Sequence, residues 1–201
     1  MKIEETHPWK WFVPKGSRSL IIGTFPTAKR NWKYDFFYPN TANLFWTVMA
    51  KIVGQELVYF SGEKAVNERK NILTKLKLGI TDMGMKVFRN DNSSLDERLI
   101  PIEYMDILKI LGLYPTIEKI ILTSSSGTVS ATNWFNNYLI EQDLSLKISK
   151  GPKPIKNKLY ITNKEVQIVT LYSTSRRATN RIKFERLVEL YKTEILTTKR
   201  K

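Results

Sequence analysis

The fold is decided by the stretch Ser19-Leu20-Ile21-Ile22-Gly23, which runs directly into the loop Thr24-Phe25-Pro26-Thr27. A short apolar run that ends at a glycine and a proline is typical of a strand buried on both faces. Such strands belong to parallel sheets that helices cover on both sides. The stretch therefore predicts a central strand of an α/β domain, with a loop at its carboxyl end.

Apolar runs and helical spacings extend this pattern along the whole chain. Strands are predicted at residues 19–23, 79–83, 119–124, 159–162 and 166–171, the last two joined at Asn163-Lys164. Helices are predicted after Thr41, over 63–77, over 104–111, through Ala131 to Tyr138, and from Thr179 or Asn180 onwards. Strands that alternate with helices predict an α/β domain with a largely parallel sheet.

Length and composition limit what this domain can be. The 201 residues predict one domain over 1–201, with an aromatic and basic segment at 1–17 and a frayed basic tail at 197–201. With no cysteine and a single histidine, His7, the chain excludes disulfides and thiolate sites and gives no basis for a metal centre, so no cofactor is expected. The charged opening MKIEETHPWK lacks a signal-peptide core, and no apolar run could span a bilayer. We expect a cytoplasmic monomer that does not associate with membranes.

The positive charge is concentrated near the carboxyl terminus. The net charge is +14, and residues 150–201 hold fourteen Lys and Arg against four Asp and Glu. A concentration of one sign is typical of a surface that faces a polyanion. Nucleic acid is favoured over an anionic membrane, because the basic segment is interleaved with predicted strands and turns.

Four polar loops follow the predicted strands, at 24–27, after Asp82, at 124–130 and at 172–179. In parallel sheets such loops meet outside the carboxyl ends of the strands, where ligands bind. Their content of Ser, Thr, Asn, Arg and Gly suits a polar ligand.

Two motifs lie in or beside these loops. In Tyr38-Pro39-Asn40-Thr41-Ala42-Asn43-Leu44-Phe45-Trp46, we assign Phe45 and Trp46 to the core, whereas the aromatic plane of Tyr38 and the amide of Asn43 suit stacking on a nucleobase and hydrogen bonding to its edge. The hydroxyls and arginines of Ser173-Thr174-Ser175-Arg176-Arg177 precede a predicted helix and suit phosphate binding. An ordinary helix cap at Thr179 or Asn180 is the alternative, and both roles are compatible.

These motifs resemble those of the uracil-DNA glycosylase superfamily, in particular its mismatch-specific and hypoxanthine-type branches. The former has Tyr-Pro-x-x-x-Asn-x-Phe-Trp, similar to Tyr38–Trp46 here. The latter has first and second motifs similar to Gly23–Pro26 and Leu171–Ser175, and two further stretches similar to Leu78–Asp82 and Ser94–Asp96. The resemblance covers about Ser19 to Asn180. It implies a three-layer α/β domain in which helices flank a mainly parallel central sheet of about four strands.

The resemblance implies a hydrolase that removes a deaminated base, uracil or hypoxanthine, from damaged or mismatched DNA. It implies that Gly23, Thr24, Phe25 and Pro26 border the base, that Tyr38 stacks on it and that Asn43 contacts its polar edge. It also implies that the DNA-binding loop is formed by Ser173, Thr174, Ser175, Arg176 and Arg177. Such hydrolysis needs no cofactor, and no lysine is placed by a motif for a lyase step.

The chain also departs from the family pattern. Phe25 occupies a position where many members carry an Asp or Asn that holds the hydrolytic water, and the second-motif histidine of the classical uracil branch is absent. Another group must then hold the water, and our candidates are Asn43, then Asp82, then Asp35. Their alternative roles are to cap a helix, to cap a loop and to remain solvated, respectively.

Phe25 also favours a second hypothesis, a catalytically silent DNA-damage or DNA-binding module on the same fold. A small α/β enzyme with a phosphate ligand is a third possibility, but the chain lacks a glycine-rich nucleotide fingerprint. For the segment His7-Pro8-Trp9-Lys10-Trp11-Phe12, we expect packing of its aromatic rings on the sheet edge, with DNA contact by His7 or Lys10 as the alternative.

Overall fold

The central sheet of the molecule has five strands. The protein was analysed as a computed structural model that describes residues 2–90, 99–146, 149, 151–161, 164–176 and 181–197. The strand order is β3-β2-β6-β8-β7, formed by Leu78–Asp82, Ser19–Gly23, Lys119–Leu122, Lys164–Thr170 and Ile155–Ile161. The first four strands are parallel, and β7 is antiparallel to β8. The predicted parallel arrangement is confirmed. The number of about four strands implied by the resemblance is corrected to five, because β7 pairs antiparallel with β8 and adds an edge strand.

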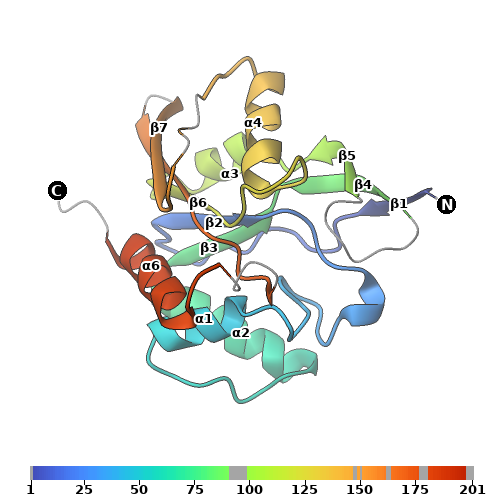
Figure 1. Ribbon diagram of the computed structural model, residues 1–201, viewed down its shortest axis with the longest axis vertical. Coiled ribbons are helices and arrows are strands. Elements are labelled where there is room, and N and C mark those ends of the chain that lie inside the picture. The colour runs from blue at the N-terminus through green and yellow to red at the C-terminus, as the bar shows by residue number, and fades with distance from the viewer. Residues whose placement is uncertain are drawn as a thin grey trace.

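A second, three-stranded sheet was not predicted. It consists of β1 (Lys2–Thr6), β4 (Gly84–Asn90) and β5 (Leu99–Tyr104), all antiparallel in the order β1-β4-β5. It lies beside the central sheet, at the end of the molecule that holds the N-terminus (Figure 1). After β1, the chain returns to the central sheet, where Phe12 forms two backbone hydrogen bonds with Ile80 of the edge strand β3. This pairing agrees with the predicted packing of the N-terminal segment on the sheet edge.

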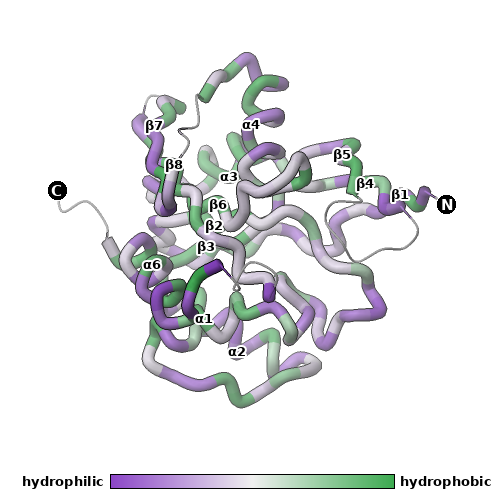
Figure 2. The backbone as a smooth tube through the Cα atoms, viewed as in Figure 1, coloured by the Kyte–Doolittle hydropathy of each residue, from purple (hydrophilic) through white to green (hydrophobic). Residues whose placement is uncertain are grey.

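Helices cover both faces of the central sheet and complete three layers. One face is covered by α1 (Phe45–Ile52), α2 (Gly62–Leu76) and α6 (Phe184–Leu196), and the other by α3 (Ile107–Leu113) and α4 (Ala131–Glu141) (Figure 1). A short 3-10 helix, Lys29–Asn31, follows the first loop. The last helix is predicted to begin at Thr179 or Asn180, which lie outside the described residues, but α6 begins at Phe184 with Lys183 as its N-cap residue. The predicted start is therefore wrong, because residues 181–183 are not helical. Hydrophobic and hydrophilic residues alternate along the helices, as amphipathic packing requires (Figure 2). Within the described ranges, no helix has both the length and the apolar character needed to cross a membrane.

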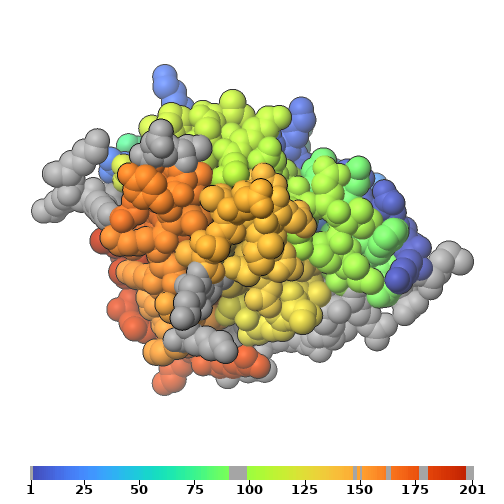
Figure 3. Space-filling model, turned by 90° about the horizontal axis from the view of Figure 1, so that it is seen from above, coloured from blue at the N-terminus to red at the C-terminus, as the bar shows by residue number. Residues whose placement is uncertain are grey.

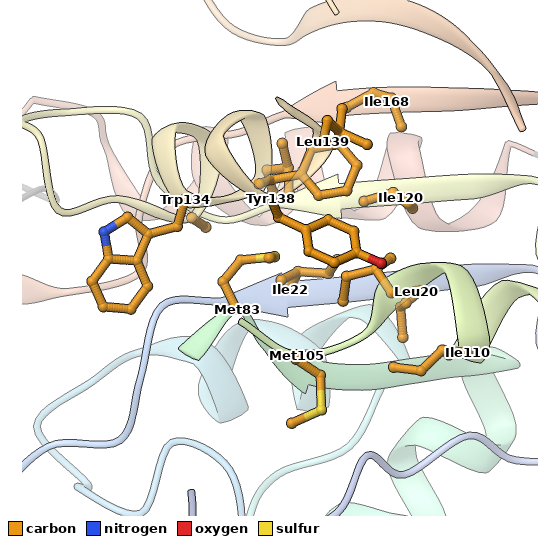
Figure 4. Packing of buried hydrophobic residues seen from close by; sticks show 14 of the residues in the cluster. Leu20, Ile22, Met83, Met105, Ile110, Ile120, Trp134, Tyr138, Leu139 and Ile168 are labelled. Atoms are coloured by element: carbon orange, nitrogen blue, oxygen red, sulfur yellow. The ribbon is translucent and has the colours of Figure 1, made fainter. Parts of the chain in front are cut away.

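The core is divided between the two faces of the central sheet. Successive residues of a strand point to opposite faces, so Ile22, Ile120 and Ile168 pack with Trp134 and Tyr138 of α4 on one side (Figure 4). Their neighbours on the strands, Ile21, Ile121 and Val169, point to the other side of the sheet. There they pack with Phe45 of α1 and Tyr191 of α6. Figure 3 shows α4 in the middle of its face, between β7 and the second sheet. Burial on both faces accounts for the unbroken apolar runs in the sequence, since each buried side chain contributes about 1.5–3 kcal/mol.

Candidate functional site

A cavity of about 800 Å³ lies beyond the carboxyl ends of the parallel strands. Its size falls within the about 300–1,000 Å³ that is typical of ligand pockets. It is lined by parts of the loops at 24–27, 38–43, 123–129 and 172–176, together with Asp82, Gly151, Lys153 and Arg181. The prediction that polar loops meet at this end of the sheet is confirmed for three of the four loops. The polar loop predicted after Asp82 is wrong, because the chain continues through Met83 into β4 at Gly84 and this stretch does not line the cavity. Tyr38 and Ser173, which are far apart in sequence, open into the same space.

Tyr38 is held rigidly at this cavity. Its backbone has a positive φ of 51°, which is uncommon for a residue with a side chain, and its carbonyl accepts a 2.7 Å hydrogen bond from the Tyr34 hydroxyl. Its ring stacks on Phe45 at 4.0 Å. Its hydroxyl lies 3.1 Å from the Thr123 hydroxyl, whose own proton is donated to the Ile22 carbonyl, so Tyr38 is the donor. Phe45 covers one side of the ring, and Tyr38 lines the cavity while only half-buried.

Asn43 presents a hydrogen-bond donor. Its Oδ1 accepts from the Phe45 backbone N–H at 2.9 Å and from the Thr174 hydroxyl at 2.7 Å. A backbone N–H needs an acceptor, so the oxygen end of the amide is fixed by this contact. Among the described residues, the Nδ2 group of Asn43 has no hydrogen-bond partner, while the side chain lines the cavity. Asn43 accepts from the N–H of Phe45, the first residue of α1, although the N-cap position itself is Leu44, and it keeps an N–H donor for a ligand.

Asp82 supplies the carboxylate of the site. It ends β3 directly beside Gly23, the last residue of β2, and it lines the cavity although only 6% of the residue is exposed. A Cβ atom at position 23 would overlap Asp82 Oδ1 and would lie 3.0 Å from the Tyr38 hydroxyl. Only glycine therefore leaves room for this carboxylate. The other oxygen, Oδ2, lies 3.0 Å from Nε2 of His7.

His7 belongs to the site, which the sequence did not reveal. Its side chain is 0% exposed, so a direct contact with DNA, left open by the sequence, is wrong. The imidazole packs against the rings of Trp9, Phe25 and Phe37. The separation of 75 residues between His7 and Asp82 in the chain hid this pair.

The first-motif loop is braced by the second sheet. The Thr24 carbonyl accepts from the Gly84 backbone at 3.0 Å, and the Pro26 carbonyl accepts from Arg89 Nη2 at 2.8 Å. The fully buried Arg89 also forms an ion pair with Glu5 at 2.9 Å. The sequence did not reveal Arg89, because its role depends on strand pairing between β1 and β4.

Phe25 is 8% exposed and packs edge-on against His7, so it forms a wall of the site and offers no polar atom.

The second-motif loop contains both a brace and cavity-lining residues. Thr174 is 1% exposed and bonds to Asn43, so the predicted DNA contact of its side chain is corrected to a bracing role. Ser173, Ser175 and Arg176 line the cavity, and the Ser173 hydroxyl accepts from the Ser175 backbone at 3.1 Å. Arg177 and the Ser94–Asp96 stretch lie outside the described residues.

Asp35 is not brought to this site. It is exposed and lines a separate cavity of about 490 Å³ with Lys29, Lys33, Tyr34 and Lys70. The third candidate for holding the water therefore does not meet Asn43 and Asp82.

Three cations, Lys153, Arg176 and Arg181, line the main cavity. Lys153 Nζ lies 5.0 Å from the centre of the Tyr172 ring, and burial together with the nearby Arg181 guanidinium lowers the pKa of the Lys153 ammonium. The sequence indicated only a chain break at Gly151-Pro152-Lys153-Pro154, so Lys153 was missed, as was Arg181. In the described part of the chain, no three His, Asp or Glu side chains gather so as to hold a metal ion. The cavity combines an aromatic plane, an amide donor, a carboxylate and cations.

Comparison with known proteins supports the architecture. No protein-family model matches the chain, and no curated protein matches it. Among solved structures, it is similar to the solution NMR structure of a protein from Methanosarcina acetivorans described as a "putative Uracil DNA glycosylase", with a TM-score of 0.60 and 15% identity. The similarity covers 96% of this chain and 97% of the other. At this level of identity the comparison shows the fold alone: over nearly its whole length, the chain has the α/β fold of that protein.

Proposed function

We propose that this chain is a DNA glycosylase that hydrolyses the N-glycosidic bond of uracil or hypoxanthine after the base has left the DNA stack. The observation that carries this proposal is that Tyr38, Asn43, Asp82 and Ser173 border one cavity at the carboxyl edge of the sheet. The fold shared with a protein described as a glycosylase and the net charge of +14 support it. Extruding a base costs a few kcal/mol, least at a lesion or mismatch.

The extruded base is held by Tyr38 and Asn43. Tyr38 offers a ring fixed in orientation by Phe45 and Thr123. Asn43 Nδ2 donates to a carbonyl oxygen, which both uracil and hypoxanthine carry. As the glycosidic bond breaks, negative charge develops on the base, so this hydrogen bond becomes stronger in the transition state.

Asp82 takes the role of holding the water. Asn43 Oδ1 already accepts two hydrogen bonds, so the amide has little capacity left to accept one from water, whereas Asp82 Oδ1 lies beside Gly23 at the cavity. The water oxygen forms a bond to the sugar C1′, the C1′–N bond breaks with its electron pair on the base, and the water proton passes to Oδ1. The carboxylate also stabilises the positive charge that develops on the sugar.

The DNA backbone is bound by the cations and hydroxyls at the cavity. Lys153, Arg176 and Arg181 supply positive charge, and Ser173 and Ser175 supply hydroxyl groups. The predicted contact by Arg177 remains part of this proposal. Phosphate contacts of this kind set the register of the protein on the duplex and carry most of its salt dependence.

The test is excision from duplexes that carry one uracil or one hypoxanthine, detected by strand cleavage in alkali. Asn43→Asp keeps an oxygen for Phe45 and Thr174 but removes the Nδ2 donor, and we expect it to lower the single-turnover rate by about 100-fold. Asn67→Asp on α2, outside the main cavity, adds the same charge and is expected to match the wild type. A normal rate in Asn43→Asp would remove Asn43 from catalysis.

The silent DNA-binding module remains the second candidate, and Phe25 favours it because a phenyl ring cannot position water. Tight binding to a lesion duplex by the wild-type protein, with no strand cleavage above the protein-free control for either base, would establish this alternative and overturn the glycosylase proposal.

A further inference from the structure

A proton must lie between His7 and Asp82. Nδ1 of His7 lies 2.7 Å from the Trp9 carbonyl and 3.2 Å from the Trp9 backbone nitrogen, and Nε2 lies 3.0 Å from Asp82 Oδ2. If Nδ1 accepts from the Trp9 N–H, a neutral ring carries its proton on Nε2. If Nδ1 donates to the carbonyl, then either Nε2 is also protonated or the carboxyl group is. Every assignment therefore links Nε2 and Oδ2 by a hydrogen bond.

Apart from its contacts with the Trp9 backbone and with Asp82, the imidazole of this pair packs against aromatic rings. Trp9, Phe25 and Phe37 contact the imidazole, and Asp82 is the charged group that faces it. The Arg89 guanidinium lies 5.7 Å from the centre of the Phe25 ring and is paired with Glu5. The pair is open only at Asp82 Oδ1, which is at the cavity.

We infer that His7 is a positioning residue that holds Asp82 as an ionised acceptor by donating its Nε2–H to Oδ2, so that Oδ1 alone is directed at the hydrolytic water. This inference rests on the proposed function. A hydrogen-bonded carboxylate in an apolar setting keeps one orientation, and misplacing a reacting group by about 1 Å costs about 100-fold in rate.

This arrangement gives Phe25 a role. The resemblance places the water-holding Asp or Asn of many family members at this position, whereas here the phenyl ring closes the compartment that contains His7. The carboxylate comes instead from the end of the neighbouring strand, where Asp82 pairs in register with Gly23. The acidic group thus moves from the loop after β2 to the end of β3.

Two substitutions of His7 distinguish a role in positioning Asp82 from a role in packing alone. His7→Leu keeps an apolar side chain but removes the donor, and we expect the single-turnover rate to fall by about 100-fold while the affinity for abasic duplex stays unchanged. His7→Gln restores an N–H near the position of Nε2, and its rate is expected to recover by about tenfold over His7→Leu, because a hydrogen bond to a charged group is stronger than one between neutral groups. Trp9→Phe alters the packing but keeps the Trp9 backbone groups, and it serves as the control.

The pair can also be observed without activity, because His7 is the only histidine. In protein labelled with ¹⁵N-histidine, NMR at neutral pH is expected to show a protonated Nε2 whose proton resonance moves upfield in Asp82→Asn. An unprotonated Nε2 would place the proton on Asp82 and would overturn the inference.

The outcomes distinguish the two proposals. An active wild type with a normal rate in His7→Leu, or a His7→Gln variant no faster than His7→Leu, would overturn the positioning role alone. A wild type that excises neither base would overturn the proposed function and the catalytic part of this inference, and the NMR measurement would still decide whether His7 donates to Asp82.

Discussion

Each end of the central sheet holds a buried pair of interacting polar side chains, one where the strands begin and one where they end. The two pairs differ in how many of their polar atoms have partners. At the amino end, the Lys119 ammonium lies 2.6 Å from the Glu194 carbonyl, 2.8 Å from the Thr197 carbonyl and 3.8 Å from Glu194 Oε2. The other carboxylate oxygen of Glu194 lies 2.7 Å from Lys156. At the carboxyl end, His7 takes one oxygen of Asp82, and the other lies at the cavity.

Under the proposed function, the first pair has a structural role and the second has a chemical one. The Lys119–Glu194 pair fixes the end of α6 against the start of β6. Among the described residues, the Lys119 ammonium and both carboxylate oxygens of Glu194 already have partners. Its burial lowers the pKa of Lys119, although the Glu194 carboxylate opposes this effect. The His7–Asp82 pair leaves an acceptor beside the residues proposed to bind a base. We therefore expect substitutions in the His7–Asp82 pair to change activity and substitutions in the Lys119–Glu194 pair to change stability.

Asp82→Asn is expected to have the largest effect. It keeps an oxygen that can accept from His7 but removes the negative charge, so the excision rate should fall by about 1,000-fold. The free energy of unfolding in urea should change by only about 1 kcal/mol. A large loss of stability with a normal rate per folded molecule would make this pair structural, like the other.

Glu194→Gln should show the opposite pattern. It leaves the buried Lys119 without its carboxylate, which is expected to lower the free energy of unfolding by about 3 kcal/mol. The excision rate at 25 °C should not change. Glu189→Gln, which affects an exposed pair with Arg186 on the same helix, should cost at most about 1 kcal/mol. Loss of activity in folded Glu194→Gln would contradict the contrast between the two pairs.

Lys153 and Arg181 line the cavity but belong to neither buried pair, so we expect them to affect DNA affinity. If Lys153 and Arg181 contact phosphates, the double variant Lys153→Ala/Arg181→Ala should reduce the slope of log affinity against log salt by up to about 2. Lys158→Ala/Lys192→Ala removes the same charge from residues that do not line the cavity, and it should have a smaller effect. Fluorescence anisotropy over a range of salt concentrations measures both slopes, and equal slopes would remove Lys153 and Arg181 from the phosphate contact.

Tyr34→Phe is expected to have the smallest effect. Tyr34 belongs to neither of the two buried pairs. It removes the hydrogen bond to the Tyr38 carbonyl, worth about 1 kcal/mol of stability. Burial raises the pKa of Tyr34 to about 12 from 10.0, so its contribution is complete below pH 10 and is lost as the pH rises from 10 to 12. Urea unfolding at pH 8 and 11 should show a smaller alkaline decrease in Tyr34→Phe than in the wild type. The exposed Tyr160→Phe variant is the control and should lose as much stability between pH 8 and 11 as the wild type. An equally large loss in Tyr34→Phe would contradict the prediction.

Strands of the central sheet could be predicted from the sequence, whereas the second sheet could not. Ser19–Gly23 and Lys119–Leu122 are buried on both faces, and such burial produces apolar runs that are visible in one segment. By contrast, β1 is the polar sequence KIEET, and β5 contains Pro101. These strands form because β4 pairs with both of them, and pairing between distant segments leaves little local signal.

The same reasoning explains which site residues were found. Tyr38, Asn43 and Asp82 stand at the ends of predicted elements, and parallel topology brings such ends together. His7 and Arg89 act through partners 75 and 84 residues away. Their roles depend on packing, which no spacing in the sequence encodes.

Gly23 and Asp82 have a consequence for how this site can vary. They compete for the same small volume, so a side chain at position 23 and a carboxylate at position 82 exclude each other. A saturation library screened for excision should therefore return glycine alone at position 23. A smaller residue at position 82 would make room for a side chain at position 23, but it would remove the carboxylate. A second substitution at position 82 is therefore not expected to restore excision to a variant of Gly23.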